Sequence, residues 1–103
     1  MRKILYPGTF DPIHNGHIDI AIRTADLFDQ LEFVVAVNPD KKTLFSIEER
    51  VDLIKNSVKS QKNIKVNFFN GLVVEYASSK GHSAIIRGLR HVSDFEFEFQ
   101  MAM

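Results

Sequence analysis

The sequence alternates short apolar segments with longer segments of helical period, and this alternation restricts the fold more than any other feature. Residues 33–37 form an unbroken apolar run, which is typical of a strand covered on both faces. Further apolar runs predict strands at residues 4–6, 64–68 and 84–86. Buried strands that alternate with helices indicate a parallel sheet between helical layers, and right-handed crossovers leave few topologies.

Three helices are predicted between these strands. The first covers residues 15–28, where apolar side chains recur on one helical face. The second follows Ser46, which forms a capping-box pattern with Glu49. The third covers residues 72–80 and ends at Gly81, a usual residue at a helix C-terminus.

An α/β, doubly wound parallel sheet of strand order 3-2-1-4 is the expected architecture. Strands one and four are then neighbours where the winding reverses, and ligands bind there, beyond the carboxyl ends of the strands. His14 and His17 open the helix that follows strand one, where unpaired N–H groups attract anions. Arg87 and Arg90 follow strand four, and arginine is suited to bidentate binding of phosphate. We therefore expect His17, Arg87 and Arg90 to face one anion pocket.

Composition narrows the class of protein. The 103 residues are 45% apolar and 25% charged, which is ordinary for one small globular domain. Thirteen basic residues balance thirteen acidic ones, so no global field attracts nucleic acid or a membrane surface. No cysteine is present, which excludes disulfides and thiolate metal sites. Without a signal-peptide or membrane-spanning pattern, a cytoplasmic protein is expected.

Several motifs together resemble one enzyme family. His14-x-Gly16-His17 resembles the (T/H)xGH signature of the nucleotidyltransferase superfamily. IRGLR at 86–90, followed by DFE at 94–96, is similar to bacterial phosphopantetheine adenylyltransferases, and NPDKK at 38–42 and FSIEER at 45–50 fit the same family in order and spacing. The resemblance covers the whole chain. It implies a Rossmann-like nucleotidyltransferase fold.

The resemblance also implies that the chain, a single domain over residues 1–103, stops early at its C-terminus. Family members continue into a further strand, a serine-rich nucleotide loop and closing helices. With that fifth strand missing, strand four is expected to have an unpaired edge. Residues 94–100 are read in two ways: the alternation of Phe with Glu favours a strand, whereas the resemblance favours a helix.

The implied activity is transfer of AMP from ATP to 4′-phosphopantetheine, giving dephospho-coenzyme A and pyrophosphate, with Mg²⁺ as the cofactor. The family assembles as hexamers, so a homo-oligomer is expected. One alternative is nicotinate-mononucleotide adenylyltransferase, whose opening motif suits His14. Cytidylyltransferases share the HxGH motif but fit the other motifs poorly. A further alternative is an inactive ligand-binding fragment that lacks the C-terminal nucleotide loop.

The resemblance assigns site residues position by position, and no metal ligands are among them. The catalytic residues are His17, as transition-state stabiliser, with Lys41 and Arg90. The ATP-binding residues are Thr9, Phe10, His17, Gly88, Leu89, Arg90 and Glu98. The acceptor-binding residues are Thr9, Lys41, Val73 and Arg87.

Five other residues receive expectations from their surroundings in the sequence. Asp11 is expected to fix a turn rather than bind a metal. His82 and His91 have no motif around them and are expected at the surface. Phe68 and Phe69 are expected in the core.

Overall fold

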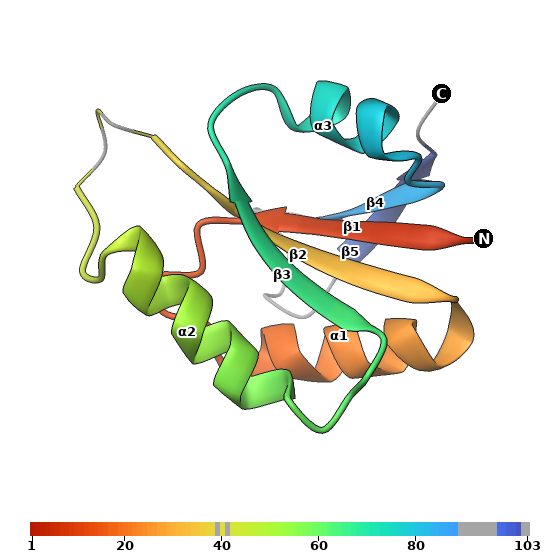
Figure 1. The fold of residues 1–103 in the computed structure, drawn as a ribbon, viewed down its shortest axis with the longest axis horizontal. Coiled ribbons are helices and arrows are strands. Elements are labelled where there is room, and N and C mark those ends of the chain that lie inside the picture. The colour runs from red at the N-terminus through yellow and green to blue at the C-terminus, as the bar shows by residue number, and fades with distance from the viewer. Residues whose placement is uncertain (39, 41, 89–96, 102–103) are drawn as a thin grey trace.

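A single five-stranded sheet with helices on both faces forms the computed structural model (Figure 1), which describes residues 1–38, 40, 42–88 and 97–101. The helices are α1 (Asn15–Leu27), α2 (Ile47–Val58) and α3 (Val73–Lys80). The strands are β1 (Lys3–Gly8), β2 (Gln30–Ala36), β3 (Ile64–Phe69), β4 (Ala84–Gly88) and β5 (Phe97–Met101). Of the three described helices, α1 and α2 cover one face of the sheet and α3 covers the other.

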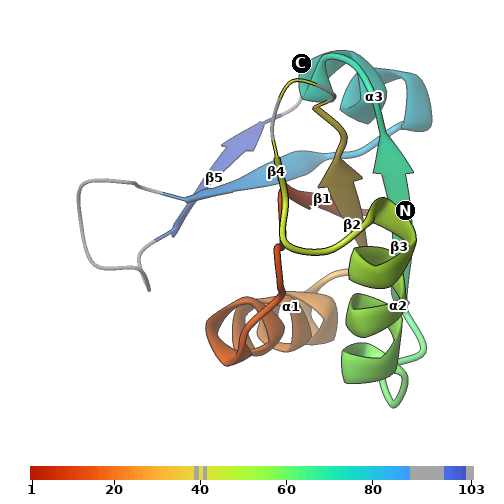
Figure 2. The ribbon, with the colours of Figure 1, turned by 90° about the vertical axis from the view of Figure 1, so that its left-hand side faces the viewer.

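The strand order is β3-β2-β1-β4-β5, and the first four strands are parallel. The predicted order 3-2-1-4 is therefore confirmed, with β1 and β4 adjacent where the winding reverses. Their pairing aligns Ile4 with Ala84 and Leu5 with Ile85. The carboxyl ends of these strands lie together at the left of Figure 1, and Figure 2 faces this edge.

Strand β5 changes one expectation about this sheet. It pairs antiparallel with β4, from Ala84 opposite Met101 to Gly88 opposite Phe97. The predicted unpaired edge of β4 is therefore wrong for the described chain. Residues 97–100 take the strand that their alternation indicates, not the helix that the resemblance favours. Residues 94–96 lie outside the described part of the structure.

The two faces of the sheet bury cores of unequal size. Alternate residues of a strand point to opposite faces, so Phe33 and Val35 of β2 join the larger core, under α1 and α2, while Val34 faces α3. This explains why the apolar run at 33–37 is unbroken. The smaller core consists of Leu5, Val34, Tyr76, Ala77 and Ile85.

The helix ends follow the sequence signals. Ser46 Oγ accepts from the Glu49 N–H at 3.1 Å, and Glu49 Oε1 accepts from the Ser46 N–H at 2.9 Å, which completes the predicted capping box. Helix α3 ends at Gly81 with φ 75°, a left-handed conformation that favours glycine. None of the helices formed by the described residues has the length and apolar content that a membrane span requires.

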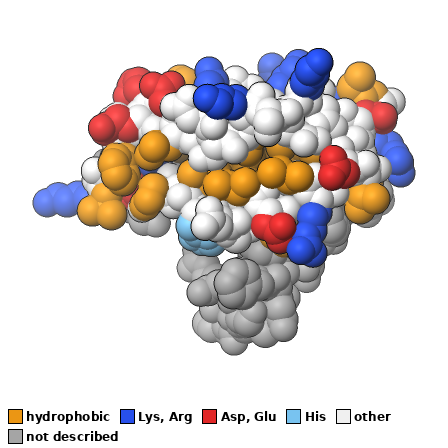
Figure 3. All heavy atoms as spheres, turned by 90° about the horizontal axis from the view of Figure 1, so that it is seen from below, with side chains coloured by type: hydrophobic (Ala, Val, Ile, Leu, Met, Phe, Trp, Pro, Cys, Tyr) orange, Lys and Arg blue, Asp and Glu red, His pale blue; other side chains and the backbone are white. Residues whose placement is uncertain are grey.

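The outer surface holds one departure from the predicted core. Phe68 is 60% exposed, so its expected burial is wrong, whereas Phe69 is partly buried and packs on the ring of Tyr76. Phe68 lies on β3, the strand at the end of the sheet, with only β2 beside it. The space-filling view from below shows hydrophobic side chains in a band across the middle of this face, with Lys and Arg side chains at several places around its margin (Figure 3).

Candidate active site

Two histidines begin helix α1 and form its N-terminal cap. His14 Nδ1 accepts from the Gly16 N–H at 3.1 Å, and His17 Nδ1 accepts from the His14 N–H at 3.1 Å. Their rings stack with centroids 3.6 Å apart. This is a capping box in which imidazoles replace the usual Ser and Glu side chains. Because each Nδ1 accepts, the neutral tautomer of each ring carries its proton on Nε2.

His17 is half-buried between the helix and an aromatic cluster. The ring of Phe10 lies edge-on to it at 5.0 Å, and that of Tyr6 at 6.2 Å. Burial, and after it the charge of His14, lowers the pKa of His17 to about 4. At neutral pH His17 is therefore an uncharged ring that presents Nε2–H as a hydrogen-bond donor at a helix N-terminus.

The loop between β1 and α1 is shaped by Phe10. This residue has a φ of 48°, which is unusual for a side chain of its size, and its ring is buried against Tyr6 and Phe33. The ring also lies over Gly8, where an added Cβ would come within 2.9 Å of it. Phe10, predicted to contact ATP, thus uses its side chain in the core.

Asp11 and Arg50 join this loop to the loop that precedes α2. The carboxylate of Asp11 accepts from the N–H groups of Leu44 at 2.6 Å and Phe45 at 2.8 Å. The buried guanidinium of Arg50 donates to the Thr9 carbonyl at 3.0 Å. Asp11 therefore has the structural role that was predicted, although it fixes a different loop from its own. Arg50 belongs to the FSIEER motif at 45–50, but no role was predicted for its side chain.

Arg87 lies on the other face of the same edge. A hollow of about 310 Å³ is lined by this residue together with Pro7, Val73, Val74 and Ile85. Four of these five lining residues have apolar side chains, and the fifth is Arg87. Val73 and Arg87, both predicted to bind the acceptor, thus line one hollow. His17 is not among the lining residues.

The predicted anion pocket is only partly described. His17 belongs to α1 and Arg87 belongs to the α3 face, so the two flank the carboxyl ends of β1 and β4 from opposite faces of the sheet. Arg90 lies outside the described residues, as do Lys41, Leu89 and His91. Gly88 ends β4, and Glu98 is in register with Arg87 on β5. The shared pocket stays a prediction.

A buried polar cluster was missed by the sequence analysis. Glu32 of β2 is 6% exposed and accepts from the side chains of Tyr76 and Asn67, while its other oxygen pairs with His82 Nε2 at 2.8 Å. His82, expected at the surface, is 4% exposed, so that expectation is wrong. His82 follows the end of α3, and its ring stacks on that of Tyr76 with centroids 6.0 Å apart. A lone Glu between Leu31 and Phe33 was the available signal.

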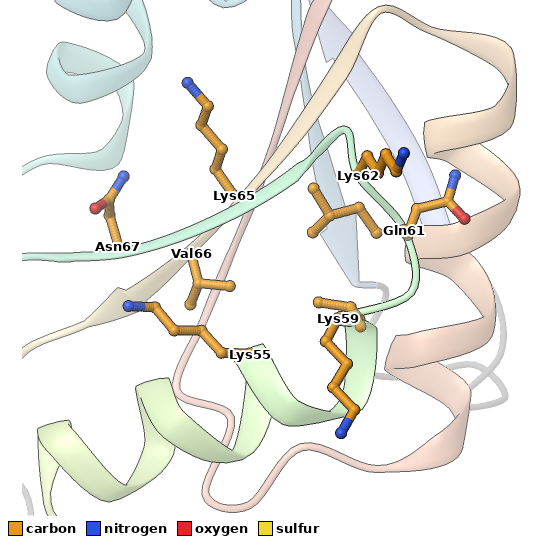
Figure 4. A pocket seen from close by; sticks show the side chains of 9 residues that line it. Lys55, Lys59, Gln61, Lys62, Lys65, Val66 and Asn67 are labelled. Atoms are coloured by element: carbon orange, nitrogen blue, oxygen red, sulfur yellow. The ribbon is translucent and has the colours of Figure 1, made fainter.

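A larger hollow, of about 460 Å³, lies between the end of α2 and the start of β3 (Figure 4). Its apolar residues are Val58, Ile64 and Val66, and its basic residues are Lys55, Lys59, Lys62 and Lys65. Figure 4 shows the four lysine side chains extending in different directions, not converging on one point. This hollow is also remote from the carboxyl ends of the strands, so we do not assign the active site to it.

The parallel sheet with helices on both faces defines a Rossmann-like α/β domain. Comparison with known proteins places the chain in a family. The family model for cytidylyltransferase-like proteins matches residues 5–103, and the chain belongs to that family. A solved structure, the lipopolysaccharide core biosynthesis protein from Thermoplasma volcanium, has a similar fold, with a TM-score of 0.66 over 91% of this chain and 80% of that one. At 24% identity it supports the fold alone.

Within the family, the chain is similar to phosphopantetheine adenylyltransferases. It is 56% identical over all 103 residues to the enzyme from Caldanaerobacter subterraneus subsp. tengcongensis, and 52% identical to that from Carboxydothermus hydrogenoformans. In both cases it spans 64% of the relative's length.

Proposed function

We propose that the protein transfers AMP from ATP to the phosphate of 4′-phosphopantetheine, releasing pyrophosphate and forming dephospho-coenzyme A. The observation that carries this proposal is the similarity to phosphopantetheine adenylyltransferases along the whole chain. The geometry supports it, because the N-terminus of α1 and the hollow beside Arg87 flank the edge at which β1 and β4 end, where both could receive ligands. ATP would lie on the His17 side and the acceptor on the Arg87 side.

The chemistry fits this set of residues. An acceptor phosphate oxygen attacks the α-phosphorus of ATP, and the bond from that phosphorus to the bridging oxygen of pyrophosphate breaks. The nucleophile is already an anion, so the protein must supply positioning and charge stabilisation rather than a strong base. His17 would donate its Nε2–H to the α-phosphate, and a neutral donor needs no proton transfer to do so. Lys41 and Arg90 would supply positive charge.

The acceptor's form suits the hollow beside α3. 4′-Phosphopantetheine has a long arm with gem-dimethyl and methylene groups, which apolar walls at Val73 and Ile85 would bury. Arg87 would bind the phosphate group of the acceptor. Thr9 would contact both substrates, and Phe10, Gly88, Leu89 and Glu98 would complete the ATP site.

Mg²⁺ would reach the site bound to ATP. The described residues contain no group of three or more His, Asp or Glu side chains that fits a metal ion. Mg²⁺ commonly binds through substrate phosphates, and held by the triphosphate it would offset negative charge on the ATP tail. We further propose a cytoplasmic homo-oligomer, hexameric as in the family, that acts without nucleic acid.

Release of pyrophosphate tests the function. The full-length polypeptide should produce pyrophosphate from ATP and 4′-phosphopantetheine, and little from ATP and nicotinate mononucleotide. CTP should replace ATP poorly. Turnover with nicotinate mononucleotide alone, or with CTP alone, would contradict the assignment. Assaying residues 1–103 in parallel tests the alternative that this segment binds ligand without turning over.

A further inference from the structure

We propose that Glu32 is a positioning residue: by binding Tyr76, Asn67 and His82 it holds α3 so that Val73 forms one wall of the acceptor hollow. The identity of the acceptor in this inference rests on the proposed function. The clamp itself, defined as these four side chains, rests on the geometry alone.

The carboxylate of Glu32 has three side-chain partners, one on β3, one on α3 and one just after α3. Its Oε2 accepts from Asn67 Nδ2 of β3 at 2.6 Å and from the hydroxyl of Tyr76 of α3, and its Oε1 lies 2.8 Å from Nε2 of His82. Burial by itself would raise the pKa of Glu32, but these partners together hold it below its ordinary value. Glu32 is therefore ionised at neutral pH, and a buried carboxylate that loses a donor is costly.

Helix α3 needs such an attachment. It has eight residues, fewer than an isolated helix requires for stability in water. Its N-cap residue, Leu72, makes no side-chain hydrogen bond, and only Tyr76 and Ala77 within it are buried. Its position must therefore come from contacts with the sheet, and the clamp reaches it at Tyr76 and again at His82, just beyond its end.

The clamp is linked to the hollow by direct packing. Val73 precedes Tyr76 by three residues and so lies on the same face of α3. Val73 packs against the small core that contains Tyr76 and Ile85. Val73 and Ile85 also line the hollow beside Arg87. A shift of α3 on the sheet would therefore move one wall of the hollow relative to the guanidinium.

A carboxylate at residue 32 is better suited to fixing the position of α3 than to raising the free energy of unfolding. Apolar side chains at all four clamp positions would avoid the cost of burying polar groups, and replacing a whole buried pair in this way is often neutral or stabilising. The clamp even leaves Nδ1 of His82 without a hydrogen-bond partner. Glu32 instead fixes the position of α3 on the sheet, because its hydrogen bonds to Tyr76 and His82 form together in only one placement of this helix.

The test uses the full-length polypeptide with Tyr76→Phe, which removes one hydroxyl, and with Glu32→Gln and Glu32→Ala. Asn63→Ala is the matched control, because Asn63 Nδ2 donates to the Ala25 carbonyl at 2.7 Å, on the α1 side of the sheet. Two measurements are made on each: hydrogen exchange of the α3 amides, and the KM values for 4′-phosphopantetheine and ATP.

In Tyr76→Phe we expect α3 amides to exchange about fivefold to tenfold faster, as for the loss of one buried hydrogen bond. The KM for 4′-phosphopantetheine should rise by about the same factor, with kcat and the KM for ATP within about twofold of the parent. Glu32→Gln should retain more of both properties than Glu32→Ala, because Gln still accepts from one donor. Asn63→Ala should lower the melting temperature without either effect.

Unchanged α3 exchange in Tyr76→Phe and Glu32→Gln, or equal rises in the two KM values, would overturn the inference. Absence of turnover in the parent protein would instead contradict the proposed function. The exchange measurement would then still decide whether Glu32 holds α3.

Discussion

The ring of His17 has a structural role through one nitrogen and a proposed catalytic role through the other. Its Nδ1 caps helix α1 by accepting from the His14 N–H, and its Nε2–H would be the donor to ATP in the proposed reaction. A substitution with alanine would remove both functions, so the effect of that change alone does not separate them. Glutamine is a usual capping-box residue at this position, and it offers a way to do so.

We expect both His17→Ala and His17→Gln to lower kcat by about 100- to 1000-fold, as for loss of one transition-state donor. Helix α1 should remain intact in His17→Gln, because glutamine can accept from the His14 N–H. Steady-state kinetics and circular dichroism check this. Near-normal kcat in His17→Gln would show that the ring serves the fold only.

The low pKa of His17 predicts a dependence of stability on pH. Between about 4 and the ordinary value near 6.5, the unfolded chain binds a proton at residue 17 that the folded protein does not. The contribution of His17 to stability is therefore complete above pH 6.5 and declines as the pH falls toward 4. Urea unfolding at pH 7 and pH 5 should show a smaller difference in His17→Gln than in the parent.

Bound nucleotide should reverse this shift in pKa. An anion beside His17 stabilises the imidazolium, so saturating ATP should raise the pKa of this ring. NMR titration of the His17 Cε1–H resonance with and without ATP measures the change. An unaltered titration in the presence of bound ATP would place the nucleotide away from His17.

Asp11 joins the loop that follows β1 to the loop that precedes α2 at the carboxyl edge of the sheet. Asp11→Ala would free the N–H groups of Leu44 and Phe45, and we expect a loss of about 1–2 kcal/mol in the free energy of unfolding. Asp29→Ala is the control, because Asp29 accepts from the Arg2 N–H at the opposite end of the sheet. Only Asp11→Ala should also raise the KM for ATP, since only it loosens the loop that carries Thr9.

Helix α2 offers a separate test of stability without a change in chemistry. Ser46→Ala removes the cap at its first turn and should cost about 1 kcal/mol by urea unfolding. Ser57→Ala, in the same helix, removes only a hydroxyl that donates to the Leu53 carbonyl, and should be close to neutral. Equal effects of the two changes would indicate that the capping box is not formed in solution.

Across the whole molecule, sequence patterns predicted the helices and strands that depend on interactions between residues close together in the chain. Apolar runs and capping residues located the first four strands and three helices, because each signal lies within the element that it defines. Residues 97–100 fit both a helical and a strand period, so only their pairing with β4 decides between them. Glu32 and Arg50 have partners about 30 to 50 residues away, which no short pattern contains.

The candidate site shows the same division. His14 and His17 were predicted together because they share one helix end, and Val73 with Arg87 because the resemblance paired them. The burial of His82 was missed because nothing beside it in the sequence signals the carboxylate of Glu32 across the fold.

Because His17 caps α1, unwinding of the first turn of this helix should also remove activity. The bond that starts the helix also decides which nitrogen of the ring carries the proton. A molecule in which this first turn has unwound therefore loses its helix start and its donor in the same event. On heating, turnover should therefore be lost at or below the temperature at which α1 melts. No temperature range is expected in which α1 is intact but His17 carries its proton on Nδ1.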